Sequence, residues 1–149
     1  MDTILTVRPL AADDKPAWRA LFDGYLAFYG ASVDGAVIET TWTRLNTPAD
    51  GHHIGLIAHQ RERGPVGLAH VLFHRSTWSP THYCYLEDLF VAPDARGHGA
   101  GRALIEAVYR EADARGCTRT YWSTQEFNET ARVLYDRVAT LSPFLQYRR

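Results

Sequence analysis

The feature that most constrains this chain is a loop in which glycine recurs at every second position. Its residues are Arg96, Gly97, His98, Gly99, Ala100, Gly101 and Arg102. Glycine lets the backbone approach a ligand closely, and consecutive backbone N–H groups can then point at one anion. A helix predicted to begin near Arg102 adds the positive end of its dipole at the same place. The segment therefore predicts a phosphate-binding site.

The loop lies between a predicted strand and a predicted helix. The strand covers residues 83–91 and is indicated by its aromatic and β-branched content. The helix is indicated by apolar residues at helical spacing from Ala103 to Ala112. Glu87 and Asp88 interrupt the strand near its middle, where strand propensity disfavours acids. We therefore expect that a ligand or a neighbouring group uses these carboxylates.

Two other interpretations of the glycine loop are less consistent with its pattern. A dinucleotide-binding loop has the spacing G-x-G-x-x-G and follows the first strand of a parallel unit. Here the spacing is G-x-G-x-G, and the loop comes late in the chain after strands predicted to be antiparallel. A flexible turn does not explain three alternating glycines flanked by two arginines. Phosphate binding remains the interpretation that the pattern favours.

From this loop onward the chain resembles the GCN5-related N-acetyltransferases. The coenzyme A motif of that family is Arg or Gln, two residues, Gly, one residue, then Gly or Ala. Arg96, Gly99 and Gly101 match this motif. The resemblance implies acetyl-CoA as a co-substrate and an acetyltransferase activity.

The resemblance continues to the C-terminus. Asn128 and Tyr135 match the family's Asn-to-Tyr pair on the helix after the next strand. Residues 86–91 and 134–136 are most similar to the branch that contains polyamine, histone and D-amino-acid N-acetyltransferases. The match is good over residues 83–149, whereas earlier residues match only in general layout.

Periodicity and turn residues predict the order of elements along the chain. Strands are expected at residues 4–7, 54–59, 66–74, 83–91, 118–124 and 144–147. Helices are expected from Asp13 or Asp14 to Tyr29, over 34–45, from about Arg102, and over 128–138. This order predicts an α/β fold, with a mixed, partly antiparallel central sheet and helices on both faces. The family's fold has the same order.

Length and composition limit the class of protein. A chain of 149 residues, 46% hydrophobic and 22% charged, predicts one globular domain over residues 1–149. The formal net charge of -1 gives no excess of positive charge for binding nucleic acid, so we expect no nucleic-acid partner. No apolar run is long enough to span a bilayer, so we expect no membrane partner. The two cysteines, Cys84 and Cys117, do not have the C-x-x-C spacing or another metal-ligand spacing, which predicts a reduced, cytoplasmic protein. The seven histidines lack an acid-rich cluster, so no metal is expected.

The resemblance also implies how acetyl-CoA would be held. Main-chain donors of residues 97–102 would bind the pyrophosphate, and the His98 side chain would touch phosphate. The backbone of Leu89, Phe90 and Val91 would pair with the pantetheine arm like an added strand and leave one N–H for the thioester oxygen. Asn128 would bond to the pantetheine amides and also cap its helix.

Acetyl transfer to an amine needs a base, because an alkylamine resembling Lys has a pKa of about 10.4 and is mostly protonated at neutral pH. Glu87 is the candidate base, acting through water, since it alternates with Tyr85 and Leu89 on one face of the strand. The alternative is that Glu87 binds the substrate's positive charge or pairs with an arginine. Asp88, which points the other way on a regular strand, is expected to be a structural partner.

The departing thiolate needs an acid, and Tyr135 is the candidate. From periodicity alone a core tyrosine is the simpler interpretation, and the match at Asn128 and Tyr135 favours the acid. Four aromatic residues lie where this family forms its acceptor site, and we expect most to be core and one or two to line the pocket. They are Tyr25, Phe28, Tyr29 and Trp42.

These observations predict an N-acetyltransferase that moves the acetyl group of acetyl-CoA to a small primary amine, such as a polyamine or an amino acid. No cysteine is placed for a covalent intermediate, so direct transfer in a ternary complex is expected. The alternatives are acetylation of a protein lysine and a non-catalytic acetyl-CoA-binding sensor. The tyrosine-rich first helix and the last strand resemble elements that pair subunits in this branch, which predicts a homodimer.

Overall fold

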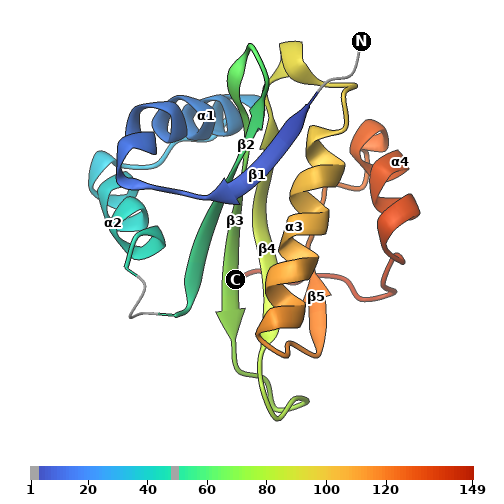
Figure 1. The fold of residues 1–149 in the computed structure, drawn as a ribbon. Coiled ribbons are helices and arrows are strands. Elements are labelled where there is room, and N and C mark those ends of the chain that lie inside the picture. Colours follow the sequence, from blue (N-terminus) through green and yellow to red (C-terminus); the bar gives the residue numbers. More distant parts are fainter. Residues whose placement is uncertain (1–3, 48–50) are drawn as a thin grey trace.

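The computed structural model describes residues 4–47 and 51–149 as a five-stranded sheet with helices on both sides (Figure 1). The strands are β1 (Leu5–Pro9), β2 (His53–Gln60), β3 (Gly64–His74), β4 (Tyr83–Val91) and β5 (Arg119–Tyr121). The helices are α1 (Lys15–Phe28), α2 (Gly35–Leu45), α3 (Ala100–Ala114) and α4 (Glu129–Val138), with 3-10 turns at Ala12–Asp14 and Pro93–Ala95. The predicted α/β class is confirmed, and so is the predicted order of elements as far as α4.

The sheet is mixed in the way the sequence predicts. Its strands lie in the order β1-β2-β3-β4-β5; the first four are antiparallel neighbours, and β5 runs parallel to β4. The hairpin between β2 and β3 and the hairpin between β3 and β4 need only short connections, whereas the parallel step from β4 to β5 is made through α3. The glycine loop opens that crossover.

Each face of the sheet packs against its own pair of helices. On one face Ile57, Leu68 and Phe90 pack against α1 and α2, and on the other Leu56 and Ala69 pack against α3 and α4. Figure 1 shows α1 and α2 on one side of the sheet and α3 and α4 on the other. Alternation of side chains along each strand explains how one strand supplies both cores.

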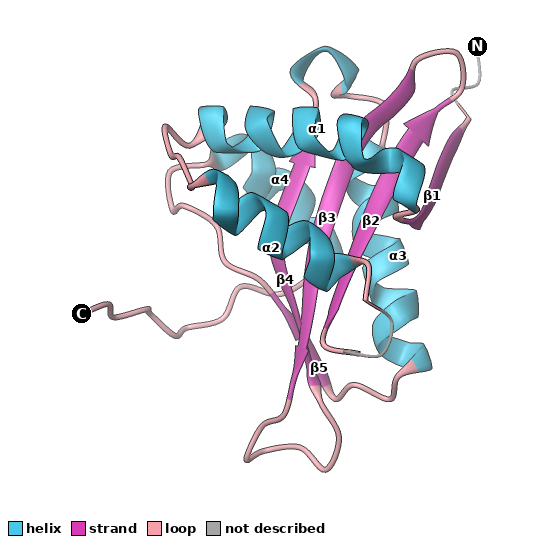
Figure 2. Cartoon of the chain, turned by 90° about the vertical axis from the view of Figure 1, so that its left-hand side faces the viewer, coloured by secondary structure: helices cyan, strands magenta, loops and turns pink. Residues whose placement is uncertain are grey.

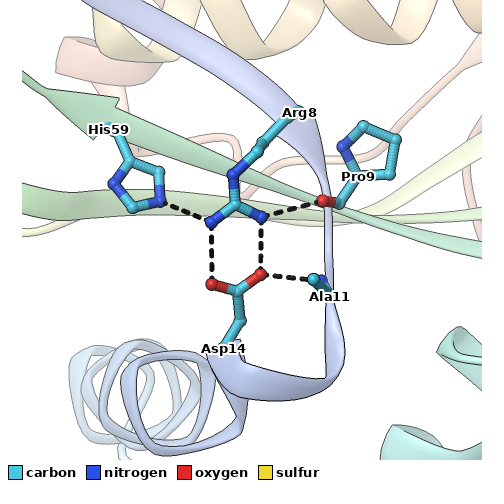
Figure 3. Close-up of polar contacts among 5 residues, drawn as sticks. All are labelled: Arg8, Pro9, Ala11, Asp14 and His59. Carbon is cyan, nitrogen blue, oxygen red and sulfur yellow. Dashed lines mark hydrogen bonds and ion pairs between the residues drawn. The ribbon is translucent and has the colours of Figure 1, made fainter.

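Helix α1 lies close to β4 and is anchored at its start. A Cβ at Gly24 would lie 3.1 Å from the Phe90 ring, so glycine allows this approach. Before α1, the Asp14 carboxylate accepts two hydrogen bonds from the Arg8 guanidinium, at 2.6 and 2.8 Å, and a third from the Ala11 amide at 2.7 Å (Figure 3). These bonds lower the pKa of Asp14 to about 2. The cluster therefore joins β1 to the start of α1.

Most predicted boundaries differ from the structure by one or two residues, and the largest differences lie in the C-terminal part of the chain. Residues 144–147 form no strand: residues 139–149 contain neither helix nor strand, and Figure 2 shows this C-terminal segment leaving the body of the molecule. A strand needs a hydrogen-bonded neighbour, and in the single chain this segment has none. Strand β5 is also shorter than the predicted 118–124, because β4 and β5 separate beyond Tyr121. Helix α3 begins at Ala100, before the predicted Arg102.

Within residues 4–47 and 51–149, no group of three or more His, Cys, Asp or Glu side chains could hold a metal ion. In the same part of the chain, no helix combines the length and the apolar character of a membrane span. Both cysteines are free; Cys84 is buried and Cys117 is partly buried.

Candidate active site

The open edge of β4 is the framework of the candidate site. The ladder between β4 and β5 covers only Tyr83 to Tyr85, which pair with Arg119 to Tyr121. In the part of the chain that the structure describes, β5 does not continue the ladder along residues 86–91. The predicted coenzyme-binding residues Leu89, Phe90 and Val91 therefore lie on a stretch of β4 that an extended ligand could join as a strand.

The glycine loop has the backbone that its composition predicts. Gly97 and Gly99 have φ values of +84° and +86°, in the left-handed region that favours glycine. Gly101 lies in the first turn of α3, where an added Cβ would be 3.3 Å from a Leu134 methyl group. The first two glycines therefore shape the loop, and the third allows α3 and α4 to approach closely.

The loop ends at the N-terminus of α3. The first helical hydrogen bond runs from the Ala103 amide to the Gly99 carbonyl, at 2.9 Å, so the amides of Ala100, Gly101 and Arg102 precede the first intrahelical bond. These N–H groups and the helix dipole suit a diphosphate. The residues present therefore fit the pyrophosphate of coenzyme A.

The three side chains of the loop have different surroundings. The Arg96 guanidinium donates to the Val91 carbonyl at 3.1 Å and lies over the Phe28 ring, 5.3 Å from its centroid. Arg102 forms an exposed ion pair with Glu106. His98 is exposed. Arg96 therefore fastens the end of β4 to the loop, while the other two side chains face solvent.

Glu87 lies at a break in the register of β4. Asp88 pairs with His70 and Leu86 with Val71, so Glu87 is an extra residue in a β-bulge. The Glu87 side chain is exposed, yet partial burial and then the negative charge of Asp88 raise the pKa of its carboxyl. A carboxylate that holds its proton more tightly than usual is a better base.

The bulge overturns the predicted directions of side chains along this strand. Tyr85 pairs with Leu72 and Asp88 with His70, and since His70 and Leu72 alternate along β3, Tyr85 and Asp88 share a face. Leu89 pairs with Ala69 and faces the α3 side. The predictions that Asp88 points away from Tyr85, and that Leu89 shares its face, are wrong because they assumed unbroken alternation. Bulges carry no clear sequence signal.

A buried hydrogen-bond chain fixes Asp88. The Trp18 indole N–H donates to His70 Nε2 at 2.8 Å, and His70 Nδ1 lies 2.8 Å from an Asp88 carboxylate oxygen. Because Nε2 accepts, the proton of the neutral ring is on Nδ1 and is donated to Asp88. Burial, and then the negative charge of Asp88, raise the pKa of Tyr25. Asp88 is thus a structural partner, as predicted, whereas the role of His70 was missed.

Tyr135 lies on α4, packed edge-on against the Trp122 ring with centroids 5.5 Å apart. Burial, and then the neighbouring Tyr29, raise its pKa to about 12, so the phenol keeps its proton at neutral pH. Asn128 caps α4, since its side-chain oxygen accepts from the Ala131 amide at 3.3 Å. The cap was predicted, and a protonated Tyr135 has the form that an acid requires.

The tyrosines of α1 link the two halves of the site. Burial, and then the negative charge of Asp88, raise the pKa of both Tyr25 and Tyr29, and Tyr135 adds a smaller contribution at Tyr25. Helix α1 and the residue that follows it thus bring two phenols within electrostatic reach of Asp88 on β4 and of Tyr135 on α4. Of the aromatic residues predicted near the acceptor, Trp42 packs on Trp18 in the core, with ring centroids 5.0 Å apart. Phe28 and Tyr29 are exposed.

The chain is similar to known acetyltransferases in sequence. Residues 8–139 match the model of the acetyltransferase (GNAT) family. The chain is 34% identical over 146 residues to the D-amino-acid N-acetyltransferase HPA3 of Saccharomyces cerevisiae, covering 97% of this chain and 90% of that protein. It is 36% identical over 75 residues to the thialysine N-epsilon-acetyltransferase of Bos taurus, which spans 49% of this chain and 44% of the relative.

A solved structure has the same fold. The aminoglycoside N-acetyltransferase AAC(6')-Iy in complex with CoA superposes with a TM-score of 0.80 at 20% identity, covering 100% of this chain and 97% of the other. At this identity the likeness shows the shared fold and leaves the acceptor open.

Proposed function

The chain belongs to the GNAT acetyltransferase family and is an acetyl-CoA-dependent N-acetyltransferase, and on this premise we propose that its acceptor is a primary amine of a small molecule. The observation that carries the proposal is the open edge of β4, which leads from the raised-pKa carboxyl of Glu87 to the glycine loop. The 34% identical relative, a D-amino-acid N-acetyltransferase by name, supports a small amine as the acceptor.

We propose direct transfer in a ternary complex. The amine nitrogen loses a proton to Glu87 through water and forms a bond to the thioester carbonyl carbon, while the carbon–sulfur bond breaks. The leaving thiolate takes a proton from Tyr135, whose pKa of about 12 keeps that proton available. An N–H of residues 89–91 donates to the carbonyl oxygen as its charge grows.

The positions of the cysteines support direct transfer over a covalent enzyme intermediate. Cys84 is fully buried in the core on the α3 side of the sheet, and burial raises the pKa of its thiol to about 11. A thiol with a raised pKa is a poor nucleophile at neutral pH. The partly buried Cys117 also has a raised pKa.

Release of free thiol from acetyl-CoA, measured with a panel of small primary amines and with a basic peptide, tests the proposal. We expect release with at least one small amine, at a higher kcat/KM than with the peptide. Release only with the peptide would refute the small-molecule acceptor and favour protein-lysine acetylation. Coenzyme binding without release for any acceptor would favour the sensor.

We also propose that the whole chain acts as one domain in a homodimer. The C-terminal segment exposes four large apolar side chains, at 70% to 94% of their surface: Leu141, Phe144, Leu145 and Tyr147. A second copy would cover them and supply the strand neighbour that residues 144–147 need. Light scattering of the full chain should give the dimer mass, and a chain ending at Thr140 should give the monomer mass. A full chain that stays monomeric at micromolar concentration would refute the dimer.

We propose a cytoplasmic location because both cysteines are free thiols, as expected of a reducing compartment. Fractionation of cells that make the chain tests this proposal. Recovery with membranes or in the culture medium would contradict it.

A further inference from the structure

The face of the sheet that carries α1 and α2 is not covered along its whole length. Figure 2 shows both helices over the upper part of this face, while the lower ends of β3 and β4, together with β5, extend beyond them. On this lower part Tyr85 pairs with Leu72 of β3 and with Tyr121 of β5. Cross-strand partners share a face, so Tyr85 and Tyr121 lie on the same face as Asp88.

Tyr85 and Tyr121 form a fixed pair that we call the tyrosine platform. Their rings stack with centroids 4.9 Å apart and planes 25° from parallel. His74 holds the pair: its Nδ1 donates to the Arg75 carbonyl at 2.7 Å, so its Nε2 accepts from the Tyr121 hydroxyl, also at 2.7 Å. Both tyrosines are partly buried, and the Tyr121 ring also meets Tyr83 edge-on. The platform therefore needs no rearrangement to act as a binding surface.

The platform adjoins the negative charges of the site. Burial, then the charge of Glu87, then that of Asp88, raise the pKa of Tyr85, and the strand register puts Asp88 on the same face of the sheet as the Tyr85 ring. The positive charge of Arg148, in the C-terminal segment, acts on the same pKa in the opposite direction. The Arg119 guanidinium lies over the Tyr83 ring instead, 4.6 Å from its centroid. Two acids beside stacked phenols suit a cation and disfavour a carboxylate.

We propose that the tyrosine platform is a specificity-determining subsite that holds a second ammonium group of the acceptor while the first nitrogen reacts beside Glu87. The inference rests on the proposed function and narrows its substrate class to diamines and longer polyamines. Leu72 and His70, the β3 partners of Tyr85 and Asp88, are two residues apart, about 7 Å along a strand, and the bulge residue Glu87 lies between Tyr85 and Asp88 on β4. That spacing is comparable to the length of a four-carbon diamine. Aromatic rings attract ammonium groups, and the attraction grows where water is partly excluded.

Kinetics with two acceptors of equal chain length test the subsite. The acceptors are 1,4-diaminobutane and n-butylamine, which differ in the second nitrogen. We expect Tyr85→Leu to raise the KM for the diamine about 5- to 30-fold, as loss of a partly desolvated ring–cation contact implies, and the KM for butylamine less than twofold. The matched variant Tyr85→Phe keeps the ring and should stay within about threefold of wild type for both amines. Equal changes for the two amines, or none with Tyr85→Leu, would overturn the proposal.

A binding measurement separates failure of the subsite from failure of the proposed function. Calorimetry with 1,4-diaminobutane against the protein saturated with free coenzyme A needs no turnover. We expect binding to wild type and to Tyr85→Phe, and binding at least fivefold weaker to Tyr85→Leu. No heat with the diamine, in a protein that does acetylate butylamine, would overturn the subsite alone. If no amine is acetylated and the diamine still binds through Tyr85, the subsite stands and the proposed reaction fails.

Discussion

Replacement of Gly97 by alanine tests whether the backbone of the glycine loop binds the coenzyme. Gly97 has a φ of +84°, and an added Cβ would meet no heavy atom within 4 Å, so the substitution introduces backbone strain without a clash. An L-residue in left-handed conformation costs about 1–2 kcal/mol. Because Gly97 is exposed, the free loop can relax away from this conformation, and coenzyme binding must then restore it. We expect the Kd for coenzyme A to rise about 5- to 30-fold, with little change in Tm.

Gly116→Ala is the matched control. Gly116 has a φ of +67° and equally open surroundings, and it lies after the end of α3, at the opposite end of that helix from the glycine loop. The same strain there should lower the Tm by several degrees and leave the Kd unchanged, because Gly116 keeps its conformation in the free and bound protein. Calorimetry and thermal melts of both variants give the comparison. Normal coenzyme affinity in Gly97→Ala, or equal loss of affinity in both variants, would refute the reasoning.

Three further predictions concern single side chains. Tyr135→Phe should lower kcat at least tenfold and leave the Kd for coenzyme A unchanged, since only the proton for the leaving thiolate is lost; an unaltered kcat in steady-state assays would remove Tyr135 from the mechanism. Glu87→Gln should lower kcat about 100-fold. In wild type we expect kcat to fall at acid pH, at a pH above the usual pKa range of a carboxyl because the pKa of Glu87 is raised, and the variant should lack this fall. An unchanged pH profile would instead favour binding of the substrate's charge by Glu87. Asp14→Asn should cost about 1–2 kcal/mol of unfolding free energy at pH 7, because the folded-state pKa of Asp14 is lowered from 3.8 to about 2 and Arg8 is partly exposed. That contribution is complete above about pH 5 and is lost as the pH falls through 2, so urea melts of wild type and variant should converge at acid pH.

Much of the fold could be predicted because it follows from local patterns. The apolar spacing of α1 and the glycine loop before α3 each indicate one structure almost independently of the rest of the chain. The register of β4 could not be predicted in this way. The acids Glu87 and Asp88 interrupt the strand pattern, but the bulge itself depends on pairing with β3, which the sequence does not specify.

The hydrogen-bond partners of Asp88 could not be predicted from the sequence either. Trp18 and Asp88 are 70 positions apart, and only the packing of α1 on β3 and β4 brings them to His70. The misplaced final strand has a related cause. Residues 144–147 have the composition of a strand, but a strand forms only beside a neighbour, which the single chain does not provide.

If the coenzyme binds along β4 where β5 separates from it, as proposed, it is part of the architecture as well as a reactant. A ligand whose amides lie in the gap between β4 and β5 would form hydrogen bonds that the two strands do not make with each other there. It would thereby connect the two halves of the molecule. Cellular coenzyme would then protect the enzyme from heat and proteolysis, by a margin set by its concentration relative to Kd. Starvation for acetyl-CoA would therefore reduce the lifetime of this protein as well as its turnover.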